Sequence, residues 1–265
     1  MRPRSLRHLA NGSMSRPGRL LAVLAAALLL SGCGSHSSPP PTPAASDAAG
    51  PQTAARPLAE APAHAQLAAL AAAAEDRSMS AVYTLSVSGQ ADRSVAVTLA
   101  VDGSWRVDIP YGALGGTVGV AVAQTGDGLF QCALPSPAHP VAPVCVRVAD
   151  RGGRIPAGAD PRVQHLFTSW VRVLSDRQAP LAVSAGKPLP GASGSCFSVE
   201  SISASLNPPL EVGIYCYTPD GTLTAARVAF GTLVLAGAPG AAPPTVSLPG
   251  PVVTGEPLSM AAPPL

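Results

Sequence analysis

Charged and aromatic side chains are scarce in this 265-residue sequence, in which 12% of the residues are charged and 4% are aromatic. Lysine occurs once, at position 187. Five of the 17 basic residues precede Cys33, so 12 basic residues face 15 acidic ones from Cys33 onward, a net charge near −3. Because nucleic-acid binding depends on a basic surface, we expect no nucleic-acid partner.

Motifs that carry catalysis or bind metals are also missing. The sequence has no His-Glu-x-x-His and no Cys-x-x-Cys pair. Its glycine-rich residues 111–119 lack the Lys-Ser/Thr of a phosphate-binding P-loop. Residues 191–195 imitate a nucleophile elbow, but Ser195 stands where glycine is required. His165 falls on the polar face of a predicted helix, where we expect it to be solvated. We therefore expect no enzyme, no catalytic residue, no metal site and no cofactor.

The longest uninterrupted apolar run, Leu20–Leu30, is short. Its eleven residues would span about 16 Å as a helix, at roughly 1.5 Å per residue. That is about half of a bilayer core of roughly 30 Å, so the run does not span as a mature helix. Arg16 and Arg19 precede the run and small residues follow it. This arrangement is typical of an export signal.

The tetrapeptide Leu30-Ser31-Gly32-Cys33 at the end of this run resembles the lipobox of bacterial lipoproteins. In that family the cysteine receives palmitate-type acyl chains and becomes the new N-terminus. The resemblance implies lipidation of Cys33 and anchoring at the extracytoplasmic face of the cell membrane. The alternative is a chance cysteine in an ordinary signal peptide. The signal ends at residue 32 whether translation begins at Met1 or Met14.

Proline-rich segments flank one predicted domain. Residues 33–62 are rich in Ser, Pro and Ala, which predicts a flexible tether. Residues 236–265 contain eight prolines and no hydrophobic periodicity, which predicts a disordered tail. The domain is therefore expected to occupy residues 63–235.

Four cysteines remain after Cys33, an even number in an exported chain, and this predicts two disulfides. Three pairings are available. We favour Cys132–Cys145 and Cys196–Cys216 because each pair flanks a single connection. A four-cysteine zinc site is the competing interpretation, but zinc ligands usually include closely spaced pairs, and this sequence has none.

Hydrophobic periodicity predicts one helix followed by antiparallel strands. Residues 64–76 are rich in alanine, with apolar residues at helical spacing. After that the period changes to two, and Asp102-Gly103 between alternating runs predicts a hairpin. The strands expected here cover residues 83–87, 95–101, 105–109, 118–123, 129–134 and 144–149.

A second helix is predicted to begin at Asp160-Pro161, since Asp is a good N-cap and Pro suits the first helical position. Its apolar stripe, which ends at Leu174, should pack against the sheet. Closing strands are expected at residues 181–185, 195–202, 212–218 and 222–235. The predicted fold class is α+β, a mainly antiparallel sheet with an N-terminal helix and one central helix packed on it.

Small residues on several strand faces leave space opposite the bulky side chains of the second helix. Such a space could be an apolar ligand pocket, or dense packing could fill it. As a hypothesis, six side chains would line or flank this hollow: Val97, Leu99, Trp105, Phe130, Phe167 and Trp170.

This order of elements behind a lipobox resembles the LolA-like lipoprotein carriers. The mycobacterial lipid-binding lipoproteins and the periplasmic sigma-regulator sensors share that architecture. The resemblance covers residues 63–235 and rests on element order and on stretches such as 82–101 and 105–109. It implies a curved half-barrel of antiparallel strands, closed by helices, whose hollow holds acyl chains. The composition, rich in Ala, Gly and Pro, is similar to that of a high-GC actinobacterium.

The first functional hypothesis is a membrane-anchored, exported lipoprotein that binds or carries a lipid at the cell envelope. The alternative is a non-catalytic interaction or sensor module with a filled core. It would bind an unidentified envelope protein through the loops at residues 112–119 and 132–145. A third hypothesis is a hydrolase that uses Ser193, which only a response of esterase activity to Ser193→Ala would support.

Overall fold

The structure, a computed structural model, describes residues 62–137, 140, 142–203 and 208–262. The predicted signal, the lipidation site Cys33 and nearly all of the predicted tether lie outside the described residues. Within the described part of the chain, neither helix is long and apolar enough to cross a membrane.

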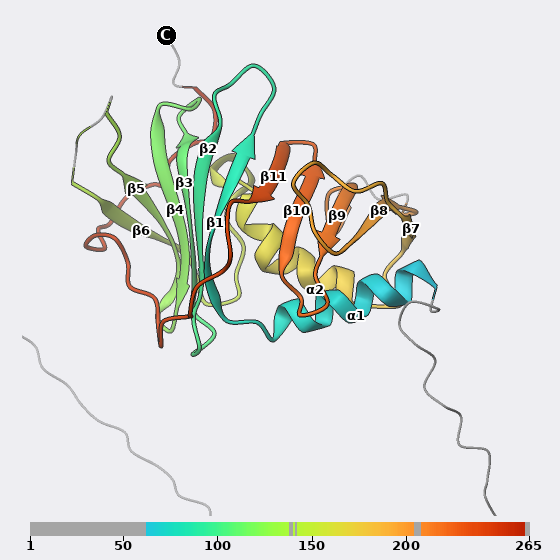
Figure 1. Ribbon diagram of the computed structural model, residues 1–265. Helices are drawn as coiled ribbons and strands as arrows, with labels where there is room; N and C mark the ends of the chain where they lie inside the picture. Colours follow the sequence, from blue (N-terminus) through green and yellow to red (C-terminus); the bar gives the residue numbers. More distant parts are fainter. Residues whose placement is uncertain (1–61, 138–139, 141, 204–207, 263–265) are drawn as a thin grey trace, which may run out of the picture. The chain divides into compact units, whose positions relative to one another are not determined.

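One open antiparallel sheet of eleven strands makes up most of the described chain (Figure 1). Its strand order is β6-β5-β4-β3-β2-β1-β11-β10-β9-β8-β7. Consecutive strands pair within β1–β6 and within β7–β11, β1 pairs with β11, and the consecutive strands β6 and β7 lie at opposite ends of the sheet. With its two α-helices, this confirms the α+β class. The strands are β1 (Met79–Ser86), β2 (Arg93–Leu99), β3 (Trp105–Ala113), β4 (Val118–Thr125), β5 (Gly128–Leu134), β6 (Val144–Ala149), β7 (Leu181–Ala185), β8 (Ser195–Ser201), β9 (Gly213–Tyr217), β10 (Leu223–Val228) and β11 (Gly231–Leu235).

The expected single strand over residues 222–235 is wrong, because two strands occupy this range. β10 and β11 pair with each other from Val228 opposite Gly231, so the chain reverses at Ala229-Phe230. The backbone N–H of Ala229 donates to Glu211 Oε2 at 2.9 Å, which fixes the reversal from outside the hairpin. This extra turn brings β11 alongside β1 and joins the two halves of the sheet.

The first helix is confirmed as α1 (Ala63–Glu75). The second is not the continuous helix expected from Asp160-Pro161. The chain forms short 3₁₀ turns, η2 (Ala157–Ala159) and η3 (Val163–Phe167), before α2 (Ser169–Ser175). Arg162 has a left-handed conformation with φ 69°, and Thr168 lies between η3 and α2 with φ −134° and ψ −100°. These two residues divide the predicted helix.

The α-helices and η3 cover one face of the sheet, which we call the inner face. Tyr83, Val97 and Val107 lie on this face in the same hydrophobic core as Leu67 of α1 and Leu174 of α2. Figure 1 shows α1 and α2 next to each other, beside the half of the sheet formed by β7–β11. The described core is therefore a helix layer packed on an antiparallel sheet.

The opposite, outer face of the sheet carries both disulfides, and both favoured pairings are confirmed. Cys132–Cys145 joins β5 to β6 with Cα atoms 3.9 Å apart, and Cys196–Cys216 joins β8 to β9 with Cα atoms 4.0 Å apart. Each bond links directly paired strands near one end of the sheet order.

The disordered tail expected from residue 236 is wrong for the described residues 236–262. The segment first crosses the outer face, where Gly240 pairs with Ser80 and the N–H of Val101 donates to Pro243 O at 3.1 Å. Val246 is buried there. Proline cannot donate to a sheet ladder, but its carbonyl can accept. The prolines of this segment therefore accept hydrogen bonds, as Pro243 and Pro244 do from Val101 and Asp102, while its other residues, such as Gly240, also donate to the sheet.

The segment then passes along the edge strand β6 and reaches the inner side. The N–H of Cys145 donates to Pro251 O at 2.9 Å, and the N–H of Val253 donates to Cys145 O at 2.8 Å. Beyond this edge, Leu258 and Met260 pack against the inner core. We call residues 236–262 the C-terminal strap. It covers part of an edge that would otherwise present unpaired backbone groups.

Candidate functional site

A small cavity lies at the seam where α1, η3–α2 and the inner face meet. Its volume is about 10 Å³, room for roughly one water molecule. We call it the seam cavity, and its lining is mostly apolar: Ala74, Arg77, Met79, Leu99, Leu166, Phe167, Val171, Tyr217, Gly221 and Leu223.

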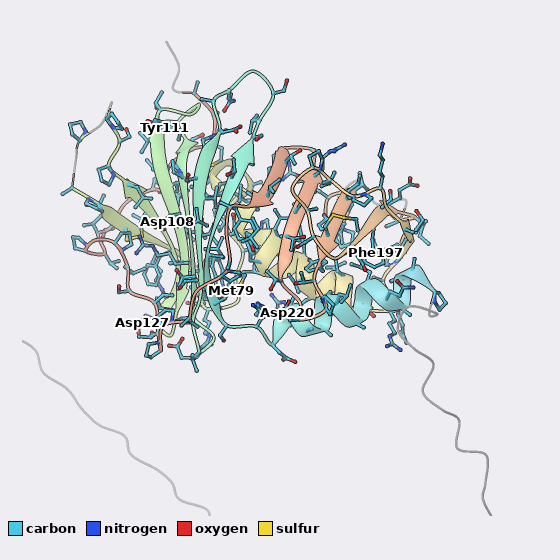
Figure 2. The ribbon with its side chains drawn as sticks, viewed as in Figure 1. Met79, Asp108, Tyr111, Asp127, Phe197 and Asp220 are labelled. Atoms are coloured by element: carbon cyan, nitrogen blue, oxygen red, sulfur yellow. A yellow bond between two sulfur atoms is a disulfide. The ribbon has the colours of Figure 1, made fainter. Side chains whose placement is uncertain are left out.

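Arg77 brings a charge to this apolar lining. It follows α1 directly, and its Nη1 lies 2.8 Å from Asp220 Oδ2 in the β9–β10 turn. Figure 2 places Asp220 and Met79 close together at the end of the sheet beside α1. The Nε of Arg77 is buried and has no hydrogen-bond partner among the described residues. The seam therefore holds a guanidinium group with one satisfied end and a buried unpaired donor.

Tyr217 supplies a second unpaired group. It is 1% exposed, and its hydroxyl has no hydrogen-bond partner within the part of the chain that the structure describes. The other two buried tyrosines nearby are paired: Tyr83 donates to Leu223 O at 2.9 Å, and Tyr215 donates to Glu211 O at 2.5 Å. Burial raises the pKa of Tyr217, and the neighbouring Tyr83 adds to the rise. The Tyr217 hydroxyl thus keeps its proton.

Of the residues predicted to line a hollow, Leu99 and Phe167 do line the seam cavity. Val97 and Trp170 are instead buried in the inner core, and Trp105 is half-buried against it. Phe167 also packs its ring 5.0 Å from that of Tyr83. These five residues belong to one interior, but packed side chains occupy most of it.

Phe130 does not belong to this interior, and its assignment to the hollow is wrong. It pairs with Ala123 and packs with Ala121 and the Cys132–Cys145 disulfide on the outer face. The next residue, Gln131, points inward instead. Successive side chains of a strand point to opposite faces, so a strand boundary alone could not decide which of the two faced the helices.

His165 occupies a hydrogen-bonded chain that the sequence interpretation missed. Its Nε2 lies 2.7 Å from Asp160 Oδ2, and its Nδ1 lies 2.8 Å from Ser169 Oγ. Carboxylate, imidazole and hydroxyl thus have the connectivity of a catalytic triad. Helical spacing alone could not have predicted this chain, because Asp160 lies outside the helices and Thr168 separates His165 in η3 from Ser169 in α2.

The hydrogen-bonded chain of Asp160, His165 and Ser169 stabilises the charged form of Asp160. Burial raises the pKa of Asp160, but hydrogen bonds and charge from His165, with hydrogen bonds from Gln164 and the Arg162 N–H, outweigh burial and lower the pKa overall. The seam cavity is lined by other residues, so Ser169 has no adjoining pocket there. We interpret the chain as a polar clasp that holds η3 and α2 together.

Ser193 has a structural role in the turn before β8. Its backbone N–H donates to Thr224 Oγ1 at 3.2 Å, and its carbonyl accepts from the same hydroxyl at 2.6 Å. The imidazole of His165 is already committed to Asp160 and Ser169. The backbone of Ser193 thus fixes this turn against Thr224 of β10.

Ion pairs and hydrogen bonds connect the helix layer to its surroundings. Arg162 pairs with Glu211, which is 7% exposed, and Ser175 of α2 donates to Glu75 of α1. The Arg77–Asp220 pair joins the end of α1 to the sheet. Three polar links thus hold the layer in addition to its apolar contacts.

A second hollow lies on the outer face, between β2, β3 and the C-terminal strap. Its volume is about 340 Å³, and Arg106, Asp108 and Ser247 are among its polar lining residues. Arg106 and Asp108 form a two-pronged pair at 2.6 Å. The loop at residues 112–119 meets the strap separately, through the N–H of Leu114 and the carbonyl of Ser259 at 2.9 Å. Residues 243 and 245–247 of the strap therefore form one wall of this hollow.

Among the described residues, no group of three or more His, Cys, Asp or Glu side chains is arranged to hold a metal ion. Comparison with known proteins adds no assignment: no protein-family model matches this chain, and no curated protein matches it.

Proposed function

We propose that this protein is a membrane-anchored, exported lipoprotein that binds a hydrophobic ligand between its helix layer and the inner face of its sheet. The resemblance to LolA-like carriers suggests the same site, with the sheet serving as a half-barrel. The lipid attached at Cys33 would hold the domain at the extracytoplasmic face of the membrane, where the acyl chains of membrane lipids are close to it.

The seam cavity is the observation that carries this proposal. It lies where three separate elements meet, and its lining residues are apolar except for Arg77 and Tyr217. Each of these two residues carries a buried group without a partner among the described residues, Arg77 Nε and the Tyr217 hydroxyl. Buried polar groups in folded proteins are nearly always hydrogen-bonded, so unpaired ones need an explanation. A ligand that enters at the seam would supply the missing partner.

A cavity of about 10 Å³ requires the helix layer to move before an acyl chain can enter. The break at Thr168 divides the layer into two short pieces, η3 and α2. Short helical pieces depend on tertiary contacts rather than on their own cooperativity. Displacement of η3 and α2 would open the space now filled by Phe167 and Trp170.

Native mass spectrometry of the full chain carrying Cys33→Ala tests this function. The expected result is an added mass that organic extraction removes, or uptake of a fatty acid or phospholipid by the extracted protein. Trp170→Glu should abolish retention because it places a charge in the apolar interior, whereas Trp170→Phe should keep it. A bare mass without any uptake, or full retention by Trp170→Glu, would refute the proposal.

The small cavity itself favours a second candidate, an interaction or sensor module with a permanently filled core. Ligand pockets usually measure about 300–1,000 Å³, well above the volume at the seam. Binding would then use the loops at residues 112–119 and 132–145. Crosslinking in cells would capture an envelope protein, and replacing these two loops would abolish the crosslink. An unchanged crosslink would exclude these loops as the contact surface.

A further inference from the structure

We infer that the seam cavity is the subsite for the acyl carboxyl or ester group of the ligand, with Arg77 and Tyr217 donating hydrogen bonds to its oxygen atoms. This inference rests on the proposed function and specifies which end of the ligand lies at the seam.

The guanidinium of Arg77 has one N–H group, at Nε, that no described residue uses and that is free to donate a hydrogen bond to a ligand. The Nη1 of Arg77 donates to Asp220, and it lies 2.8 Å from the carboxylate Oδ2 and 3.4 Å from the backbone carbonyl oxygen of that residue. The Nε of Arg77 is buried without a partner in the described chain. A guanidinium presents its N–H donors as a planar fork that matches a carboxyl group. The Nε side of Arg77 can therefore receive an oxygen without disturbing Asp220.

Tyr217 also lines this cavity, and its hydroxyl is the second donor without a partner in the described chain. Its ring is fixed in the core, and the residue is 1% exposed. Tyr83 and Tyr215 show that a buried tyrosine in this interior can find a backbone carbonyl. Tyr217 is the exception among these three, and leaving a buried donor unpaired destabilises the folded protein. An occupant that accepts its hydrogen bond removes this cost.

The charges and the walls of the cavity define the chemistry of that occupant. Arg77 can only donate, so the ligand atom that meets it must be an acceptor. Asp220 already balances the charge of Arg77, so the acceptor need not be anionic. The rest of the wall is apolar, including Met79, Leu99 and Phe167. An uncharged ester oxygen or a carboxyl oxygen at the head of an apolar chain meets both requirements.

Three brominated probes with the same chain length test the inference: 9,10-dibromostearic acid, its methyl ester and 9,10-dibromooctadecane. Bromine quenches tryptophan fluorescence, and the only tryptophans, Trp105 and Trp170, both contact the inner core. The full chain with Cys33→Ala should bind the acid and the ester about tenfold more tightly than the alkane, since two hydrogen bonds at roughly 0.5–1.5 kcal/mol each give such a ratio.

Two variants locate the effect at the seam. Tyr217→Phe removes only the hydroxyl and should lower the preference for acid and ester about threefold, while binding of the alkane stays unchanged. Arg77→Met should lower the preference further. Tyr83→Phe is the matched control, because its hydroxyl is already used by Leu223, and it should leave the preference intact.

The outcomes separate this inference from the proposed function. Equal binding of all three probes, or an unchanged preference in Tyr217→Phe, would overturn the subsite and leave hydrophobic-ligand binding in place. That is the result expected if a water molecule alone occupies the cavity. Failure of every probe to quench either tryptophan would overturn the proposed function itself, and the subsite with it.

Discussion

Gln131 and Leu258 exchange two hydrogen bonds across 127 positions of the chain. The side-chain Oε1 of Gln131 accepts from the Leu258 N–H at 2.6 Å, and its Nε2 donates to the Leu258 carbonyl at 3.1 Å. The same Nε2 donates to Ala159 O at 2.8 Å. One buried amide thus joins the sheet, the segment before the helix layer and the C-terminal strap.

Replacing Gln131 with Met should lower the free energy of unfolding by about 1–3 kcal/mol, because the strap then loses both partners inside the protein. Denaturant unfolding followed by tryptophan fluorescence measures this change. Gln178→Met, at an exposed turn, is the matched control and should have little effect. Deleting residues 245–265 should cost more than Gln131→Met, since it also removes the buried side chain of Val246 and uncovers the edge of β6. Wild-type stability of the truncated chain would show that the strap is dispensable.

Tyr217→Phe should stabilise the ligand-free protein by about 1 kcal/mol, because it removes a buried donor that has no partner in the described structure. Tyr83→Phe should instead destabilise it slightly, since Leu223 O loses its donor. Urea unfolding of the two variants side by side gives the comparison. Equal effects on stability would mean that the Tyr217 hydroxyl is satisfied in solution. If Tyr217→Phe both raises the free energy of unfolding and weakens ligand binding, the hydroxyl of Tyr217 contributes to function at the expense of stability.

Both disulfides should form in the exported protein. Without a reductant, the chain carrying Cys33→Ala should react with no thiol reagent, and labelling of any cysteine would contradict the structure. The loops close over sequence separations of 13 and 20 residues. Replacing either pair by Ala should therefore cost about 3 kcal/mol in the chain-entropy description. Thermal unfolding of the two double variants measures this loss.

The clasp of Asp160, His165 and Ser169 predicts a loss of stability in acid. The pKa of Asp160 is lower in the folded protein than its usual value, so its charged form stabilises the fold above the unfolded pKa of about 3.9. This contribution disappears as the pH falls below about 4, through the folded pKa. Asp160→Asn should remove it, and the difference in stability between the wild type and this variant should shrink between pH 6 and pH 3. Asp127→Asn, in the β4–β5 turn, is the control, and a difference that stays constant with pH would refute the role of Asp160.

Cys33→Ala should move the protein from the membrane fraction to the soluble fraction, because the acyl chains would have no attachment atom. Fractionation of cells that express the two forms, followed by immunoblotting, measures this distribution. Ser35→Ala, two residues further on, is a matched control that should stay with the membrane. Continued membrane association of Cys33→Ala would mean that something other than this lipobox holds the protein there.

Local pattern was enough to predict most of the strands and both disulfides. The alternation along residues 95–101 and 105–109, with Asp102-Gly103 between them, gave the β2–β3 hairpin. Gly103 has φ 77° there, as a tight reversal requires. The two cysteine pairs followed from parity and spacing. These features depend on neighbours along the chain, which a sequence displays directly.

The seam cavity could not be predicted in the same way. Arg77 and Tyr217 lie 140 positions apart, and neither belongs to a motif. Leu99 and Phe167 were assigned to the interior, whereas Phe130 was placed on the wrong face because one residue of register decides the face. The register of a strand in turn depends on the strand with which it pairs, and strand pairing is a tertiary contact.

The sequence by itself determined an α+β domain of antiparallel strands with two disulfides, because periodicity, turn residues and cysteine parity can be read along the chain. The tertiary structure decided three other features: the break in the helix layer at Arg162 and Thr168, the ordered strap, and the unpaired donors at the seam. Arg162 turns left-handed beside its distant partner Glu211, and the strap is ordered because donors such as Gln131 meet its backbone. Each of these depends on contacts between distant segments, whose free energies no local pattern contains.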